Sequence, residues 1–509
     1  MEKLKNEQNN WTICLECQGN GKKRRRLRKQ VRLRYQRALD QFEKAKSEGT
    51  APVRPKGHLD TCLSCRGSGL VHSATQALPD KENYPHIAII GGGIGGVALA
   101  VACLHRGIPF TLYERDSGFD TRSQGYGLTL QQASRAIEGL GISSLQEGVI
   151  STRHVVHTTE GKVIGDWGIR KLEQLDAKMP PKRTNVHIAR QSLRLALLEQ
   201  LGGHNAVHWG HQLVDFEECK GEGVELRFQV ESEGKDKGKM KSAKADLVVG
   251  ADGIRSSVRR LLIGEETTPL RYLDCIVILG ICPLADLEGE GDEGLDSCVI
   301  KNSNLLDPLL DSATVFQTAN GNERIYIMPY ASDSVMWQLS FPMSENEAKA
   351  LSAQGAQALK EEACLRCQWH DPIPQIIAAT LEAQVSGYPV YDRELLKSEL
   401  LENGAQVTLI GDAAHPMSPF KGQGANQALL DALALARGVT KGCRPLSQWK
   451  ERGVRESVLT EFESEMLDRS SKKVKDSAEA AQFLHSDTVL HEGDEPRGRC
   501  LLIKGGMEK

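Results

Sequence analysis

The stretch that decides the fold reads His86-Ile-Ala-Ile-Ile90-Gly91-Gly-Gly93-Ile94-Gly95-Gly96, an apolar strand that runs directly into a glycine-rich turn. A helix is predicted to follow this turn over residues 97–106, with Gly107 as its stop. A second short apolar run, residues 110–113, comes next and ends at Glu114. This succession of strand, glycine turn, helix and strand predicts the opening of a βαβ unit, and therefore an α/β fold.

The glycine spacing and Glu114 favour a site for an adenosine dinucleotide. Gly91 allows the tight turn, Gly93 lets the backbone approach a pyrophosphate, and Gly96 lets the helix pack on the strand. The helix N-terminus offers amides and partial positive charge to the phosphates. Glu114 lies eighteen residues after Gly96, where its carboxylate can accept hydrogen bonds from ribose hydroxyls. The alternative interpretation is an ordinary glycine turn beside a surface glutamate.

Two further motifs follow in a fixed order, each at the end of an apolar strand. Residues 246–259 read DLVVGADGIRSSVR and contain Asp252-Gly253, and residues 407–432 read VTLIGDAAHPMSPFKGQGANQALLDA and contain Gly411-Asp412. Together with the glycine turn, these segments resemble the three signature sequences of the group A FAD-dependent monooxygenases, the para-hydroxybenzoate hydroxylase-like aromatic hydroxylase family. The resemblance covers roughly residues 84–486.

The resemblance implies a Rossmann-like FAD-binding domain with an inserted β-sheet substrate domain, and it assigns roles to residues. Asp412 corresponds to the carboxylate that accepts a hydrogen bond from the ribityl chain. Helix N-terminal amides near Gly424 would stabilise negative charge on the reduced flavin ring. The residues implied for the cofactor are Gly91, Gly93, Ile94, Gly95, Gly96, Glu114, Arg115, Arg122, Arg190, Asp252, Gly253, Gly411, Asp412, Gly422, Gly424, Ala425 and Asn426, and those for the wall at the reactive side of the ring are Pro416, Pro419 and Gly422.

Some of these assignments have structural alternatives. Arg190 corresponds to an arginine that reaches the cofactor's phosphates from a helix, and Arg122 is a candidate near the flavin or nicotinamide, but surface salt bridges are the alternative for both. Asp392-Arg393 matches a family pair, for which a structural ion pair is an equal interpretation. Lys421 stands where many relatives carry a small residue, and we interpret it as pointing to water rather than binding an anionic substrate.

The activity implied by the resemblance is hydroxylation of an aromatic or polycyclic small molecule. NADPH or NADH reduces FAD, molecular oxygen forms a peroxyflavin, and the substrate ring takes one oxygen atom. The sequence names no catalytic base. The side chains considered for it are His154, His187, Tyr326 and Trp337, each interpreted first as a packing or satisfied polar residue.

The N-terminal segment carries a repeated motif, Cys14-Leu-Glu-Cys17-Gln-Gly-Asn-Gly and Cys62-Leu-Ser-Cys65-Arg-Gly-Ser-Gly. Four thiolates in two CxxC pairs suit one tetrahedral zinc ion, and the CxxCxGxG repeat resembles the zinc-binding repeats of DnaJ chaperones. A redox dithiol and a disordered thiol-rich tail are the alternatives. The third CxxC, Cys364 to Cys367, has no partner pair and is interpreted as core thiols.

Charge distribution sets this segment apart from the rest. Residues 1–80 hold 17 Lys and Arg against 8 Asp and Glu, and ten of the sixteen residues from 22 to 37 are basic. Apolar residues recur at helical spacing in this basic stretch, which predicts a charged helix. We favour a protein contact or a structural role for it over nucleic-acid binding, because no aromatic residues are interleaved.

Composition completes the prediction. No apolar run is long enough for a membrane span and the start of the chain is polar, so we expect a cytoplasmic protein.

The predicted parts are a basic zinc-binding module at 1–72, a linker at 73–84, an FAD-binding domain at 85–266 and 387–486 that includes C-terminal helices, a substrate-covering domain at 267–386, and a flexible tail at 487–509. The alternatives in function are a flavin-binding scaffold that acts through its zinc module and an NAD(P)H oxidase that releases peroxide.

Overall fold

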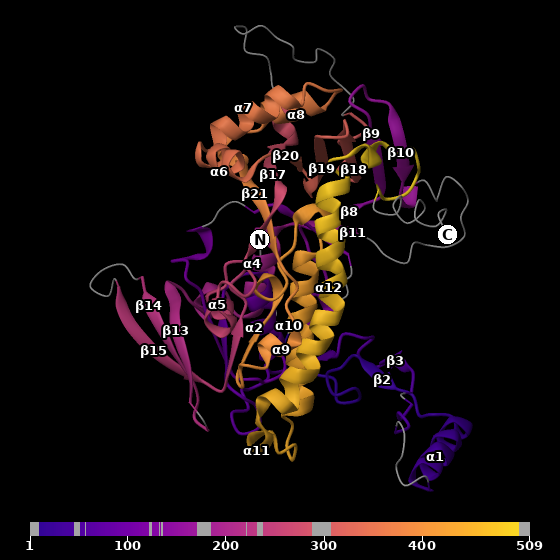
Figure 1. The fold of residues 1–509 in the computed structure, drawn as a ribbon, viewed down its shortest axis with the longest axis vertical. Coiled ribbons are helices and arrows are strands. Elements are labelled where there is room, and N and C mark those ends of the chain that lie inside the picture. Colours follow the sequence, from indigo (N-terminus) through magenta and orange to yellow (C-terminus); the bar gives the residue numbers. More distant parts are fainter. Residues whose placement is uncertain are drawn as a thin grey trace, which may run out of the picture.

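The computed structural model describes residues 10–44, 51–55, 57–121, 125–131, 133, 136–170, 185–219, 221–231, 238–287 and 307–497. Arg122, which the sequence suggested near the cofactor, lies outside these described residues. Figure 1 shows an elongated molecule in which a helical and parallel-sheet body lies below an antiparallel sheet capped by helices. The predicted α/β fold class is confirmed.

The body is built on a parallel sheet of five strands in the order β12-β6-β5-β16-β22. The central strand β5 is buried on both faces, as its continuous apolar run requires in a parallel sheet covered by helices. The bounds of the strands are β5 (Ile87–Ile90), β6 (Phe110–Tyr113), β12 (Val207–His208), β16 (Leu247–Gly250) and β22 (Val407–Leu409). The two motif strands therefore lie next to each other on one side of β5, with β16 pairing β5 and β22 pairing β16.

Helices cover the sheet and complete the body. Helix α2 begins at Ile94, three residues before the predicted start, because Gly93 is its N-cap and the turn glycines form its first turn. Its side chains from Val97 to Cys103 are all buried, so this helix is enclosed between neighbours on every side. The helices of this part are α2 (Ile94–Leu104), α4 (Arg190–Gln200), α5 (Ser257–Ile263), α9 (Ser398–Leu401), α10 (Gly424–Gly442), α11 (Trp449–Val454) and α12 (Thr460–Phe483).

The long helix α12 connects the two layers of the molecule. Figure 1 shows it running beside α10 from the level of α11 up to the antiparallel sheet. Its residues contact both α10 and strand β17. The same helix thereby supports the parallel-sheet body and the sheet above it.

A seven-stranded sheet, ordered β10-β9-β18-β19-β20-β17-β21, lies above the body. The runs 275–281, 324–329 and 336–341, whose apolar character predicts strands, fall within β17, β19 and β20. One face of the sheet packs on helices around the buried Trp337. The elements are β9 (Arg153–His157), β10 (Val163–Trp167), β17 (Leu270–Pro283), β18 (Thr314–Ala319), β19 (Arg324–Ala331), β20 (Ser334–Pro342), β21 (Val385–Arg393), α6 (Glu345–Ala353), α7 (Ala356–Arg366) and α8 (Ile373–Ala379). The opposite face looks toward the body.

Two three-stranded sheets complete this part of the chain. The sheet β7-β11-β8 lies between the body and the large sheet, and β13-β14-β15 forms a twisted outer flap of the body (Figure 1). Their bounds are β7 (Gly127–Leu130), β8 (Val149–Ser151), β11 (Asn185–Ala189), β13 (His211–Cys219), β14 (Gly223–Val230) and β15 (Lys239–Ala245).

The N-terminal segment folds around its four cysteines. Strand β1 (Trp11–Ile13) pairs with β4 (Leu70–His72), and β2 (Lys22–Arg24) pairs with β3 (Leu59–Thr61). The backbone amide of Cys14 donates to the Gly69 carbonyl at 2.8 Å, and that of Cys62 donates to the Gly21 carbonyl at 2.9 Å. The two repeats therefore exchange equivalent hydrogen bonds, as duplicated halves of one site would.

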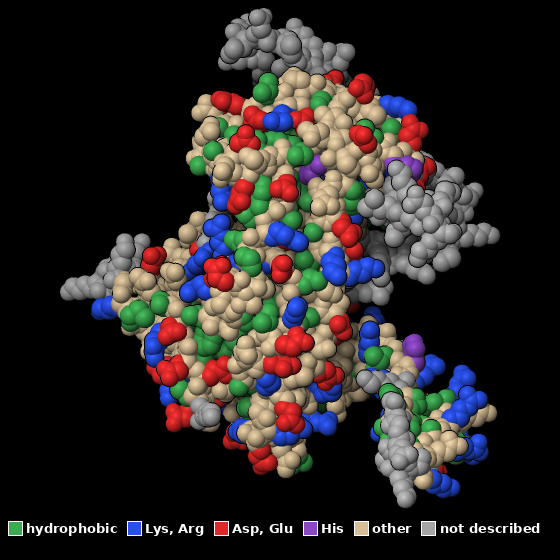
Figure 2. All heavy atoms as spheres, viewed as in Figure 1, with side chains coloured by type: hydrophobic (Ala, Val, Ile, Leu, Met, Phe, Trp, Pro, Cys, Tyr) green, Lys and Arg blue, Asp and Glu red, His purple; other side chains and the backbone are tan. Residues whose placement is uncertain are grey.

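The basic helix begins later than its pattern suggests. Residues 22–24 pair in a strand instead, and α1 runs over Lys29–Lys44. None of its residues is buried, so its apolar stripe has no partner within the described residues. Figure 1 shows α1 standing away from the body, and Figure 2 shows Lys and Arg side chains gathered on it.

The predicted linker at 73–84 and the described part of the predicted tail form hydrogen bonds with the rest of the fold. In the stretch between the module and the glycine turn, the Asp80 amide donates to the Gly107 carbonyl at 2.8 Å, and Trp449 Nε1 donates to the Asn83 carbonyl at 2.7 Å. At the other end, Arg497 Nη2 donates to the Ile164 carbonyl at 3.1 Å, so residues 487–497 pack on β10. Across the described residues, every helix is too short or too polar to cross a bilayer.

Candidate functional site

The glycine turn after β5 has a geometry that only glycines can satisfy. Gly91 has φ +111°, and a Cβ atom there would lie 2.5 Å from the Ala251 carbonyl oxygen. A Cβ atom at Gly96 would lie 1.9 Å from the Gly91 carbonyl oxygen. The turn is therefore closed tightly between β5 and β16, and the amides that open α2 remain free to face a phosphate.

Acidic side chains are held at both sides of this turn. Glu114 Oε2 accepts a hydrogen bond from the Gly92 amide at 2.6 Å, which places its carboxylate directly on the turn at the end of β6. Asp252 follows β16, and its Oδ2 atom accepts from the Ser257 amide at 2.7 Å, so it caps helix α5. Burial raises the pKa of Asp252, while its hydrogen bonds lower it. Its neighbour Gly253 has φ +82°, and Arg115, next to Glu114, forms a loose exposed pair with Asp116.

Arg190 connects the glycine turn with the second motif. It is the first residue of α4, and a Cβ atom at Gly93 would lie 3.9 Å from its Nη2 atom. Its Cζ atom lies 5.7 Å from the centre of the Tyr126 ring. Burial raises the pKa of Asp412, and charges on His415 and Arg190 oppose this rise. Arg190 therefore lies close to Gly93 and acts electrostatically on Asp412.

The loop of residues 411–424 is shaped by its glycines and by Asn426. Gly411 and Gly422 have left-handed φ values of +59° and +58°. The Asn426 side chain donates to the carbonyls of Thr129 and Gly422, each at 2.8 Å, and accepts from the Gln131 amide at 2.8 Å. Asn426 therefore ties the start of α10 to β7, with Gly424 and Ala425 lining the cavity beside it.

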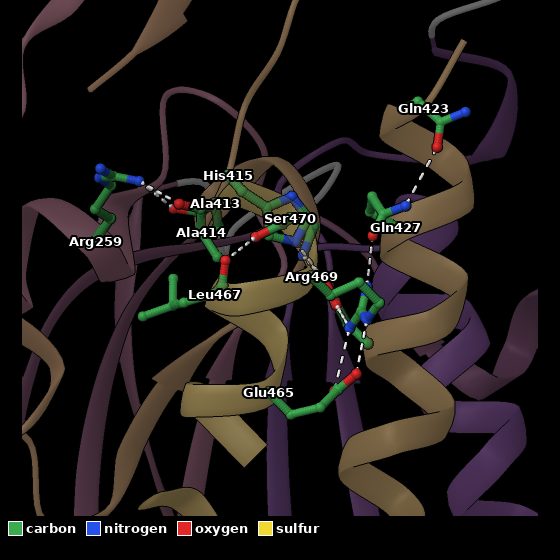
Figure 3. A network of polar contacts seen from close by, with 12 residues as sticks. Arg259, Ala413, Ala414, His415, Gln423, Gln427, Glu465, Leu467, Arg469 and Ser470 are labelled. Carbon is green, nitrogen blue, oxygen red and sulfur yellow. Dashed lines mark hydrogen bonds and ion pairs between the residues drawn. The ribbon is translucent and has the colours of Figure 1, made fainter. Parts of the chain in front are cut away.

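A polar network supports this loop from behind (Figure 3). Buried Asp431 accepts from the Gly411 amide at 2.8 Å, from His415 Nε2 at 2.7 Å and from Arg469 Nη2 at 2.8 Å. Arg469 Nη1 also donates to Gln427 at 2.6 Å, and on the other side of the loop Arg259 donates to the Ala413 carbonyl at 2.9 Å. Burial alone raises the pKa of Asp431, but His415 and Arg469 hold it below its usual range.

A cavity of about 780 Å³ lies between this loop and the seven-stranded sheet. Its volume is in the range of small-molecule and cofactor sites. The body contributes Asp412, Pro416, Pro419, Gly422, Gly424 and Ala425, and the sheets contribute Leu128, Thr129, Leu279, Arg324, Tyr326, Met328, Met336 and Tyr388. The predicted cofactor loop thus faces an apolar and aromatic wall.

Besides the exposed Arg255, two cationic side chains line the cavity, Arg324 in this wall and Lys421 on the cofactor loop. The sequence did not indicate an anion site at Arg324, and it offered one at Lys421 only as the less favoured interpretation. Arg324 is 5% exposed and opens β19, with Nε donating to Gln317 Oε1 at 2.8 Å and its Cζ atom 4.9 Å from the Tyr326 ring centre. Within the described residues, no carboxylate pairs with it. Burial lowers the pKa of Arg324 to about 10, so it stays charged at neutral pH.

Lys421 is the second cation, and its predicted orientation toward water is wrong. Its side chain lines the cavity, with Nζ 4.8 Å from the centre of the Phe483 ring. Burial lowers the pKa of Lys421, while Asp476 and Glu479 partly oppose this. The signal available in the sequence for Arg324 was a charged residue at the start of an otherwise apolar strand.

The four side chains considered as bases occupy different places. Tyr326 and His154 line the cavity, and burial raises the pKa of Tyr326 to about 12 and lowers that of His154 to about 4. His187 lies behind the cavity wall, where it contacts Thr129 at 3.1 Å and Ser151 at 2.8 Å. Trp337 points into the core on the other face of the sheet and donates to Thr380 at 2.9 Å.

Asp392 and Arg393 do not pair with each other. Asp392 is fully buried and forms two bonds of 2.8 Å with Arg271. Arg393 donates to the Ile254 carbonyl at 3.0 Å and pairs with Glu265 at 3.2 Å. Both residues connect β21 to neighbouring segments. Their contacts are therefore structural, although they form ion pairs with other residues and not with each other.

The four N-terminal cysteines come together in one buried cluster. Their Sγ atoms all lie within 4.8 Å of one another, with Cys14 and Cys62 separated by 3.9 Å and Cys17 and Cys65 by 3.6 Å. The amides of Gly21 and Gly69 donate to the sulfur atoms of Cys17 and Cys65 at 3.1 and 3.3 Å. Such N–H donors stabilise thiolates. The third CxxC, in contrast, forms no such cluster with any of the residues that the structure describes, and Cys367 is buried in the core beside α7.

The fold and the glycine turn define a protein that binds an adenine dinucleotide. Comparison with known proteins specifies the family. The family model described as FAD binding domain matches residues 85–278 and 304–444. The chain therefore belongs to the FAD binding domain family, the family of FAD-dependent monooxygenases.

Curated relatives carry names of such enzymes. A 3-amino-4-hydroxybenzoate 2-monooxygenase of Streptomyces platensis is 28% identical over 362 residues, which cover 70% of this chain and 80% of the relative. An FAD-dependent monooxygenase of Trichoderma harzianum is 25% identical over 412 residues, covering 77% of this chain and 92% of the relative.

Solved structures share the same fold. HpxO of Klebsiella pneumoniae, crystallised with FAD and uric acid, matches with a TM-score of 0.60 and 20% identity, over 83% of this chain and 93% of the other. The 2,6-dihydroxypyridine-3-hydroxylase of Arthrobacter nicotinovorans matches with a TM-score of 0.59 and 18% identity, over 81% and 94%. The part of the chain before residue 85 lies outside the family match.

Proposed function

We propose that this protein is an NAD(P)H-using monooxygenase that hydroxylates an aromatic small molecule carrying a negatively charged group. The observation that supports this proposal most directly is the large cavity, in which the cofactor loop, with Lys421, faces a wall that contains Arg324. A buried guanidinium without a carboxylate partner favours an anionic ligand. The relative named for 3-amino-4-hydroxybenzoate, an aromatic acid, agrees with such a substrate.

The residues proposed for FAD are those implied by the sequence, with Arg122 outside the described residues. The residues present fit the cofactor, because Gly91 and Gly96 close the turn where no side chain has space, and the N-terminal amides of α2 point to the place of a phosphate. Glu114 and Arg190 would hold the adenosine and pyrophosphate part, and Asp412 the ribityl chain. When bound, the flavin supplies hydride acceptance and activation of oxygen.

The protein's own residues would orient the substrate and keep water away from it. Arg324 would hold the anionic group, while Met328, Met336 and Tyr388 enclose the ring. Pro416 and Pro419 give the cofactor loop a rigid wall without amide donors. His154 stays neutral at pH 7 because burial lowers its pKa to about 4, so it can accept a hydrogen bond from a phenol.

We also propose that the cysteine cluster holds one structural zinc ion. Four buried sulfur atoms within 4.8 Å, each pair with a glycine amide donor, fit a tetrahedral tetrathiolate site. The purified protein should contain one zinc per chain, and replacing Cys17 and Cys65 by Ser should remove it.

The exposed basic helix α1 is proposed as a contact for another protein or a nucleic acid, and a cytoplasmic location remains our prediction.

The test of the enzymatic proposal is a turnover assay on the purified full chain. Released cofactor is identified from its absorption spectrum, and NADPH and NADH oxidation are followed with a panel of aromatic acids and their uncharged esters. We expect an aromatic acid to speed oxidation and to gain one oxygen atom by mass.

Other outcomes would overturn parts of this proposal. Electrons that all appear as hydrogen peroxide would instead indicate an oxidase. A bound flavin that no reductant reduces would indicate a scaffold protein. Esters that outperform the acids would contradict the anionic substrate.

A further inference from the structure

Two arginines of the FAD-binding domain lie buried beneath the cysteine cluster. Arg106 follows α2 and is 3% exposed, and its Nη1 atom donates to the Ala102 carbonyl at 3.0 Å. Its Nε and Nη2 atoms are buried and have no hydrogen-bond partner in the described part of the chain. Arg437, in α10, donates from Nη2 to the Ser68 carbonyl of the second cysteine repeat at 3.1 Å, and its buried Nε atom has no partner.

Acidic groups near these guanidinium groups include sulfurs of the cysteine cluster and, beside Arg106, the Cys103 thiol and the Tyr84 hydroxyl. Charge on Cys17 acts on both Arg106 and Arg437, and charge on Cys65 acts on Arg437. Gly19 follows Cys17 in the first repeat and precedes β2. A Cβ atom placed on Gly19 would lie 4.0 Å from Arg106 Nε. Two cations that also repel each other are therefore buried against thiol groups.

Burial of two unpaired cations is unfavourable unless negative charge is present beside them. A zinc ion with four thiolates carries a net charge of −2, which equals in size the charge of the two guanidinium groups. The two arginines lie near the C-terminal ends of α2 and α10, and a helix C-terminus carries partial negative charge. Without the arginines, these helix ends would repel a negatively charged thiolate centre.

We propose that the zinc–thiolate centre and the pair Arg106 and Arg437 are counter-ions, and that metal binding locks the N-terminal module onto the ends of α2 and α10. This inference rests on the proposed zinc site. Both helices begin at the proposed cofactor site, α2 at the glycine turn and α10 at Gly424. The module therefore fastens the far ends of the two helices whose near ends would hold the flavin.

Packing beside the arginines agrees with a fixed interface. A Cβ atom at Gly141 would lie 2.6 Å from the Trp11 ring, and one at Gly139 would lie 3.2 Å from the Ser68 carbonyl oxygen. Strand β1 and the second cysteine turn thus lie directly on the turn that follows the 3-10 segment Glu138–Leu140.

The experiment compares zinc release from the full-length holoprotein and its variants into an excess of a colorimetric chelator. Arg106→Gln and Arg437→Gln remove one counter-ion each and should release zinc at least tenfold faster than the unchanged protein. Arg437→Lys keeps the charge and should release zinc more slowly than Arg437→Gln. Arg34→Gln, an exposed position on α1, is the matched control and should behave as the unchanged protein.

A second measurement uses the unchanged protein alone and does not depend on variant folding. Limited proteolysis within residues 73–84 should accelerate after the chelator has removed zinc, because the module then leaves its arginines. Unchanged release rates in both glutamine variants, or unchanged proteolysis after zinc removal, would overturn the inference while the zinc site stands. An unchanged protein that purifies without zinc would overturn both proposals.

Discussion

Single residues carry the specificity proposed for the cavity, and Arg324 is the clearest of them. Its guanidinium is held by Gln317 and by the Tyr326 ring, so it presents its remaining N–H groups in a fixed direction. Fixed donors in a water-poor site discriminate strongly between charged and neutral ligands.

The first prediction concerns Arg324→Gln. For the best aromatic acid of the assay panel, we expect KM to rise by about 10- to 100-fold, because a charge-assisted hydrogen bond contributes about 1.5–3 kcal/mol. For the uncharged ester, KM should change little. Steady-state kinetics with both compounds checks this, and an equal loss for acid and ester would show that Arg324 does not recognise charge.

The residues of the glycine turn could be predicted from sequence, whereas Arg324 could not. Gly91 and Gly96 are required by local backbone geometry, which leaves a pattern over a few positions. Arg324 gains its position from the pairing of β18, β19 and β20, and Lys421 from the contact of its loop with α12. Long-range pairing of this kind leaves only a weak local signal, which for Arg324 is a charged residue at the start of an apolar strand.

Among the elements, the turn between β5 and α2 tolerates little change at Gly91 and Gly96. Its closeness to β16 follows from the parallel pairing that places Ala251 beside Gly91. An added methyl group cannot be relieved by a side-chain movement, since the atoms that it would meet belong to the backbone.

The second prediction is that Gly96→Ala loses FAD. The new Cβ atom would lie 1.9 Å from the Gly91 carbonyl oxygen, so the turn must open and its amides would leave the phosphate site. Gly118→Ala is the control, because its nearest neighbour would be 3.9 Å away. Flavin content per chain is measured after gel filtration. Retention of flavin at the level of the control would contradict the assigned phosphate site.

At the scale of elements, the sequence predicted the buried strands better than the N-terminal module. Residues 110–113 form β6 as predicted, because Gly107 ends the preceding helix and the short run that follows pairs in parallel with β5. The basic stretch from residue 22 was predicted to be helical, but its first residues pair with β3 to close the cysteine cluster. Pairing with a strand thirty-five residues away outweighs a local helical pattern.

For the whole molecule, buried histidines make stability depend on pH. Burial lowers the pKa of His187 to about 3 and the pKa of His485 to about 4. In the unfolded chain a histidine takes up a proton near pH 6.5, well before it does so in the folded protein. Their contribution is therefore complete above pH 6.5 and is lost as pH falls from about 6.5 toward about 4.

The third prediction follows from this difference in pKa. The free energy of unfolding, measured by urea titration between pH 7.5 and 4.5, should decrease as the pH is lowered. Below pH 6, His187→Gln should reduce the slope of this free energy against pH by up to about 1.4 kcal/mol per pH unit. An unchanged slope in the variant would show that His187 is protonated in the folded protein.

The organisation of the whole molecule was only partly visible in its sequence. The family resemblance placed an FAD-binding domain over most of the chain, and the family match supports it over residues 85–278 and 304–444. The contact between the cysteine module and the body was not predictable, because Arg106 and Arg437 lie 331 positions apart and come together only through the packing of α2 on α10.

The seating of the N-terminal module on Arg106 and Arg437 also bears on how the protein should be produced. Expression clones of flavoproteins are often trimmed to the recognisable catalytic region, which here would start near Tyr84. Such a product would bring two guanidinium groups and the small-residue turn at Gly139–Gly141 to the surface at the same time. We expect it to aggregate more readily than the full chain, which light scattering would detect, so the first eighty residues belong in any clone used for enzymology.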